Sequence, residues 1–149
     1  MEEKTPISFR LNSILDESTS IKITKDITNQ LSLETLRFQF KVNVELDLHN
    51  DKVSVTPFVR YKCKETEILS SSATFIYDIP GLKNNTDYDK TSGEINQQAD
   101  IIPTLVSASF SSMRGIIFYA TKNNILNSYP LPLVGLDSLL HKLGISVIE

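Results

Sequence analysis

The chain has little of what metal, redox and disulfide chemistry need. Its 149 residues include one cysteine, two histidines and no tryptophan. Cys63 cannot form an internal disulfide, and neither His49 nor His141 stands at metal-ligand spacing from a second candidate ligand. We therefore expect no disulfide, no metal site and no cofactor.

Phosphate-binding loops and long apolar runs are also missing. The five glycines are scattered and form no nucleotide-binding loop. No run approaches the roughly 20 apolar residues of a membrane span, and the N-terminal MEEKTPISF has no apolar signal region. The sequence predicts a cytoplasmic protein that does not bind membranes.

Positive charge is scarce as well. Lysine and arginine number 15 against 18 acidic residues, for a formal net charge of -3, so we expect no binding to nucleic acid. Asp78, Asp87 and Asp89 are interpreted as solvated charges, and no nucleophile stands with a base and an acid in a recognisable pattern. We predict that the protein is not an enzyme and assign no catalytic residue.

The clearest pattern that is present covers residues 36–48, LRFQFKVNVELDL. Every even position is apolar and every odd position between them is polar or charged. A period of two places the apolar side chains on one face of a strand and the polar ones on the other. This is typical of an antiparallel sheet with one covered face.

Two further strands continue this pattern. A tight turn at residues 49–52 leads to alternating apolar residues from Val53 to Cys63, interrupted by Pro57, where we expect a bulge or a short edge. Alternation returns before Pro80 and Gly81. A short first strand is predicted at Ile7, Phe9 and Leu11, and residues 12–35 are interpreted as a polar crossover with some edge strand.

Beyond a polar loop at residues 83–92, the apolar period changes to that of a helix. Thr91 and Glu94 have capping-box spacing, and the helical period reaches residue 123, with a kink or a new start expected at Pro103. Residues 129–133 are predicted to be extended, and residues 137–143 to form a short closing helix. The predicted fold is α+β in one domain, 1–149: a four-stranded antiparallel sheet with one long and one short C-terminal helix on one face.

The long helix carries small residues beside its apolar stripe. Serine and glycine are mediocre helix formers in water, so a cluster of them indicates that another backbone packs closely. We predict an oligomer interface at Ser107, Ala108, Ser111, Ser112 and Gly115. In addition, one helix of about 10 Å diameter cannot cover a sheet several strands wide, which leaves apolar surface for an interface or a binding groove.

The order of elements and several local strings resemble the SecB family of protein-export chaperones. The strings are Ile7-Ser8-Phe9 in the first strand, FIYDIPGL at 75–82, Pro103 near the start of the long helix, Met113-Arg114-Gly115, and PLPLVGLDSLLHKL near the C-terminus. The resemblance implies a four-stranded sheet with a long and a short helix, assembled as a dimer of dimers. It also implies a holdase, which keeps unfolded polypeptides soluble in apolar grooves without ATP.

The resemblance assigns positions to such a groove. By position, the floor would be Phe38, Phe40 and Val42, and the flexible wall Tyr129, Leu131, Leu133 and Leu136. The small-residue strip of the long helix would then be the contact between subunits of the tetramer. A dimer is the alternative oligomeric state.

One departure concerns the family's translocation motor, SecA, which docks on acidic residues. Here Arg60, Lys62 and Lys64 occupy the exposed face of the second long strand, so we do not expect SecA to dock. A chaperone dedicated to another client, such as an antitoxin, is an alternative. Two others are an enzyme like the hot-dog thioesterases, disfavoured by element order, and a structural oligomer without an open groove.

Overall fold

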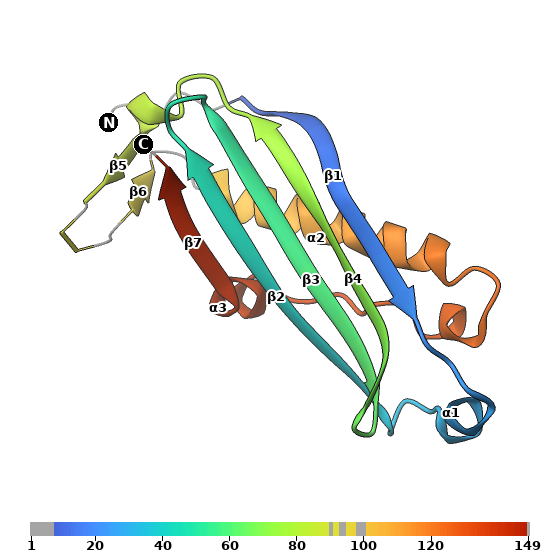
Figure 1. Ribbon diagram of the computed structural model, residues 1–149. Coiled ribbons are helices and arrows are strands. Elements are labelled where there is room, and N and C mark those ends of the chain that lie inside the picture. The colour runs from blue at the N-terminus through green and yellow to red at the C-terminus, as the bar shows by residue number, and fades with distance from the viewer. Residues whose placement is uncertain (1–7, 90, 93–94, 98–100, 149) are drawn as a thin grey trace.

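The computed structural model describes residues 8–89, 91–92, 95–97 and 101–148, and its main layer is a five-stranded sheet in the order β1-β4-β3-β2-β7. A long helix, α2, lies across one face of this sheet (Figure 1). The strands are β1 (Arg10–Ile21), β2 (Leu36–Asp47), β3 (Lys52–Cys63), β4 (Thr66–Asp78) and β7 (Leu143–Ile148). The pairs β1–β4, β4–β3 and β3–β2 are antiparallel, and β7 runs parallel to β2.

The central hairpin confirms the alternating pattern. Strands β2 and β3 pair in unbroken register from Leu36 opposite Cys63 to Asp47 opposite Lys52. Val42, Val44 and Leu46 are buried on the inner face, the face toward α2, and the odd positions point to the outer face. Asp51 has a φ of 52° in the turn, a backbone conformation that aspartate tolerates.

The predicted bulge at Pro57 is absent. The β2–β3 register runs through Val42 opposite Pro57, and the β3–β4 register is the same before and after this residue. The β3–β4 ladder stops at Val55 opposite Phe75 and resumes at Phe58 opposite Ser72, which agrees with the alternative prediction of a short edge. A proline removes one backbone donor, which an extended strand can lose without changing its register.

The segment before β2 contains the predicted edge strand, but the strand lies earlier and is longer than predicted. Residues 12–21 belong to β1, which is 12 residues long, and helix α1 (Lys25–Gln30) follows after its N-cap Thr24. Two register shifts interrupt β1, at 11–13 and 15–18, so its side chains do not follow one period of two. Bulges of this kind are common in edge strands and discourage pairing with other chains. Ile7 of the predicted first strand lies outside the described residues.

The long helix begins later than predicted. After the short helix η1 (Lys83–Asn85), strand β5 (Thr86–Tyr88) pairs with β6 (Ile95–Gln97), where the sequence predicted a loop and then helix. Glu94 of the predicted capping box lies outside the described residues. Helix α2 (Ile101–Ala120) has Pro103 in its first turn, where no backbone donor is needed, and this confirms a helix start near that proline.

The C-terminus also differs from the prediction. Helix α3 (Leu136–His141) is shorter than expected, and Leu143 to Ile148 form β7 beside Val42 to Asp47 of β2. The sheet is therefore five-stranded and mixed, whereas a four-stranded antiparallel sheet was predicted. A short apolar run such as LGISVI does not reveal by its period whether it ends a helix or forms a strand.

Helix α2 packs against β3 and β4. Its length and mean hydropathy, 1.4 over 18 residues, would also suit a membrane span, but 44% of that window is buried inside the protein. Its sheet-facing side supplies core residues: Ile101, Ile102, Leu105, Val106, Ser109, Phe110, Met113 and Ile117. Burial against the sheet accounts for its apolar character.

One buried hydrogen bond joins α2 to the sheet. The hydroxyls of Tyr77 in β4 and Ser109 in α2 lie 2.8 Å apart in the core. Burial raises the pKa of Tyr77, and the bond to Ser109 partly opposes that rise. Each hydroxyl thus provides the other with a hydrogen-bond partner in a place that water cannot reach.

We expect Ser109→Ala to lower the free energy of unfolding by about 1–3 kcal/mol, because the buried Tyr77 hydroxyl loses its partner. Urea denaturation followed by circular dichroism measures the change. The double variant Ser109→Ala with Tyr77→Phe should recover most of the loss, since no unpaired hydroxyl then remains. Equal stability of the single and double variants would contradict this account.

Candidate apolar groove

Helix α2 covers the middle of the sheet and leaves apolar side chains uncovered at its margins. On β1, Leu11 and Ile14 point to the inner face but remain 44% and 45% exposed. On β2, Phe38 and Phe40 are only half-buried, whereas Val42 in the same strand is fully buried. Apolar surface therefore remains open beside β1 and beside the first half of β2.

Two aromatic pairs fix the rings of Phe38 and Phe40, two of the three residues predicted for the groove floor. The ring of Phe38 meets Tyr61 of β3 edge to face with centroids 4.7 Å apart, and Phe40 meets Phe110 of α2 at 5.6 Å. Such pairs fix ring orientation. Phe38 and Phe40 thus present firmly held apolar surface, and Val42 lies in the core and presents none.

Tyr61 and Arg114 were not identified from the sequence as parts of this region. Tyr61 is fully buried, and its hydroxyl has no hydrogen-bond partner within the described part of the chain. Burial raises the pKa of Tyr61, and the positive charge of Arg114 opposes this. The sequence did offer one signal for Arg114, which is that it is a charged residue among apolar and small residues in the predicted long helix.

Arg114 also holds the segment that was predicted to form the groove wall. Its Nε donates to the carbonyl oxygen of Leu131 at 3.1 Å, which ties the extended segment after η2 (Ile125–Ser128) to α2. Leu131 is buried and Tyr129 is half-buried, whereas Leu133 is 84% and Leu136 40% exposed. Of the positions predicted for a groove, Phe38, Phe40, Tyr129, Leu133 and Leu136 therefore keep surface that a partner could contact, and Val42 and Leu131 do not.

The small-residue strip lies on the side of α2 away from the core. Ser107, Ser111, Ser112 and Gly115 are exposed and Ala108 is half-buried. Nothing lies within 4 Å of where a Cβ at Gly115 would stand. Ser112 and Gly115 also line a hollow of about 780 Å³ between α2 and β1, together with Ile14, Ile116 and Tyr119. The predicted strip is therefore exposed and borders an open hollow.

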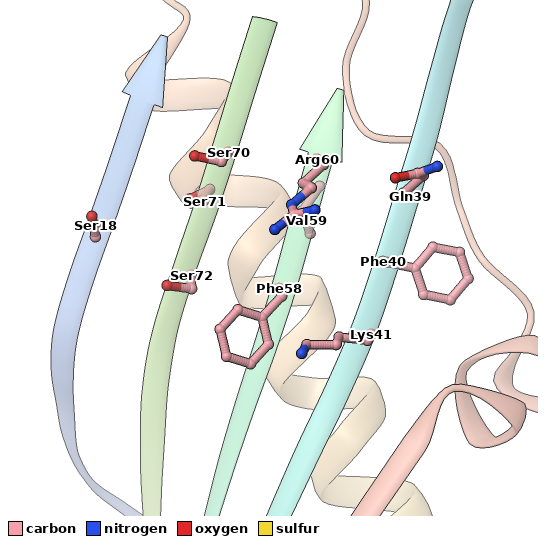
Figure 2. Close-up of a pocket in the computed structure, with 10 residues that line it drawn as sticks. All are labelled: Ser18, Gln39, Phe40, Lys41, Phe58, Val59, Arg60, Ser70, Ser71 and Ser72. Carbon is pink, nitrogen blue, oxygen red and sulfur yellow. The ribbon is translucent and has the colours of Figure 1, made fainter. Parts of the chain in front are cut away.

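The outer face of the sheet is more polar, and its basic side chains lie mostly at one end of the β2–β3 hairpin. A hollow of about 420 Å³ is lined by residues of β1 to β4, with Phe58 and Lys41 side by side (Figure 2). The Lys41 ammonium lies 4.8 Å from the Phe58 ring centroid, and Arg60 pairs with Glu67 at 3.1 Å. Arg37 stands in register with Lys62, so like charges face each other across two strands.

The described residues hold no group of three or more histidine, cysteine, aspartate or glutamate side chains that could bind a metal ion. Cys63 is buried, with its thiol 3.8 Å from the Thr35 hydroxyl. A hydrogen bond from Asn12, and next one from Arg10, lowers the pKa of Asp78, which is a carboxylate held in surface pairs.

No protein-family model matches this chain, and no curated protein matches it in sequence. A search of solved structures finds a SecB-like chaperone of Mycobacterium tuberculosis, in complex with a peptide from the antitoxin HigA1. The TM-score is 0.50 with 11% sequence identity, over 85% of this chain and 90% of that one. The fold is SecB-like.

This likeness agrees with the resemblance of element order seen in the sequence. At 11% identity it concerns the fold alone. The half-buried rings of Phe38 and Phe40 are features of this chain that the likeness does not explain.

Proposed function

We propose that the protein is an ATP-independent chaperone that holds unfolded polypeptides in the groove formed by Phe38, Phe40, Tyr129, Leu133 and Leu136. The observation that carries this proposal is the half-buried pair Phe38 and Phe40, whose rings meet Tyr61 and Phe110 edge to face and keep part of their apolar surface open. Contiguous exposed apolar surface is costly in a soluble protein, and a binding site gives it a purpose. Extended chains with apolar side chains would fill it.

A dedicated client is a second candidate. The structural neighbour is a SecB-like chaperone in complex with an antitoxin peptide, which makes a specialised client a reasonable proposal for this chain too. The like charges of Arg37 and Lys62, which face each other on the outer face, also support a client other than an exported protein, because they would repel a basic docking partner. We propose that SecA is not a partner.

The proposal includes assembly and location. We propose a homo-oligomer, a dimer or a tetramer, that packs through the exposed strip of α2 formed by Ser107, Ala108, Ser111, Ser112 and Gly115. We further propose that the protein acts in the cytoplasm without catalysis, cofactor or nucleic acid. Sedimentation velocity at micromolar concentration measures the assembly, and a monomer would contradict this part of the proposal.

Suppression of aggregation tests the holdase. Citrate synthase diluted from denaturant scatters light as it aggregates, and the full chain at equimolar oligomer should reduce that scattering to a small fraction without ATP. Serum albumin at the same mass concentration is the control for crowding. Undiminished scattering, together with no binding of a fluorescent unfolded protein, would refute the proposal.

A further inference from the structure

The C-terminal strand β7 occupies part of an edge that otherwise belongs to the groove. Strand β2 pairs with β3 along its whole length, but β7 covers only Val42 to Asp47 on the other side. Within the described chain, residues 36–41 have no strand on that side. The open half of this edge contains Phe38 and Phe40, the groove floor.

The backbone of the open half is oriented for pairing. Val42 donates its N–H to the carbonyl of Lys142 at 3.2 Å, and Leu48 donates to that of Ile148 at 2.9 Å. Backbone groups alternate sides along a strand, so the N–H and C=O groups of Phe38 and Phe40 point to the same side as those of Val42. An extended polypeptide there would gain backbone hydrogen bonds and contact with the aromatic rings at once.

Strand β7 itself is weakly anchored. Ile145 and Ile148 are 43% and 46% exposed, and only Leu143 and Val147 pack partly against the core. The central strands, in contrast, carry fully buried side chains such as Val55 and Phe75. Strand β7 is held mainly by its ladder with β2, a parallel pairing that is slightly less stable per residue than an antiparallel one.

We infer that β7 is a displaceable occupant of the β2 edge, and that a client segment with alternating apolar residues takes its place, parallel to β2. The chain's own LGISVI is the template, because its apolar Leu143, Ile145 and Val147 continue the inner face. The client residue that takes the place of Gly144 should be small, because a Cβ at Gly144 would lie 3.1 Å from Asn43 Oδ1. This inference rests on the proposed chaperone function and adds the mode of client binding and its control.

A reversible cross-link tests the inference in the full chain. Glu45 and Ser146 are partners in register, and neighbouring strands about 4.8 Å apart lie within the separation that a disulfide spans. The client is fluorescently labelled α-lactalbumin that has been reduced and carboxymethylated. Once the double variant Glu45→Cys with Ser146→Cys is oxidised, its affinity for this client should fall about fivefold or more. The cross-linked β7 then always occupies the edge, which lowers the fraction of protein molecules whose edge is free to bind. Dithiothreitol should restore the affinity. The single variant Glu45→Cys should bind the client with the same affinity under oxidising and reducing conditions.

A second full-length variant loosens β7 without a cross-link. Leu143→Ser with Val147→Ser removes its two core contacts and should tighten client binding. Ile148→Ser, on the outer face and already 46% exposed, is the matched control and should change little. Amide exchange at Phe38 and Phe40 should slow when the client is present.

The outcomes separate the two proposals. If the client binds the oxidised, reduced and loosened proteins equally, β7 does not control the edge, and the chaperone function stands. If none of these proteins binds the client while exchange shows β7 loosened by the two serine substitutions, the chaperone function fails.

Discussion

Replacing Phe110 by alanine is expected to lower the free energy of unfolding by about 3–5 kcal/mol. The ring is buried in the contact of α2 with the sheet and packs on Phe40, so its removal loses apolar burial and leaves a cavity. A domain of this size has a total stability of only about 5–15 kcal/mol. Urea denaturation followed by circular dichroism measures the loss.

The same helix supplies the control. Phe118 is 53% exposed, on the side of α2 that carries the small-residue strip, so Phe118→Ala should change the stability of the dissociated monomer by less than about 0.5 kcal/mol. Equal losses at the two positions would mean that α2 does not cover the sheet in the way described. A large loss at Phe118 alone would indicate that this side of α2 is buried in an oligomer.

The second large effect concerns client binding. Replacing Phe38 and Leu133 by serine is expected to weaken binding of unfolded protein by about 10- to 100-fold, because a few buried apolar contacts dominate most binding energies. Leu133 is 84% exposed and Phe38 is half-buried, so much of this change falls on surface that only a client would cover. Fluorescence anisotropy with a labelled unfolded protein measures the affinity.

Leu15 gives the matched control for this variant. It is a similarly apolar side chain, 48% exposed, but it stands opposite Thr74 on the outer face. Leu15→Ser should leave the affinity unchanged. If Leu15→Ser weakens binding as much as the double variant, the client lies on the outer face, beside Phe58 and Lys41, and the groove assignment is wrong.

The sequence alone determined the central strands and the nature of the long helix. Strands β2 and β3 and most of β4 alternate without interruption, and α2 has a clear apolar side, because each of these elements buries one face in the same core. Alternation also predicted that Phe38 and Phe40 share the inner face with Val42. These are local consequences of a period of two or of 3.6 residues.

Only the tertiary structure decided the edges of the sheet and which inner residues stay open. Strands β1 and β7 pair through backbone groups whose partner lies far away in the chain, and one is bulged and the other is six residues long, so neither shows a clear period. Likewise, Val42 and Leu131 became core while Phe38 and Leu133 did not. Their burial depends on where α2 and β7 cross the sheet and on the bond from Arg114 to Leu131, which are contacts between distant segments that no local pattern encodes.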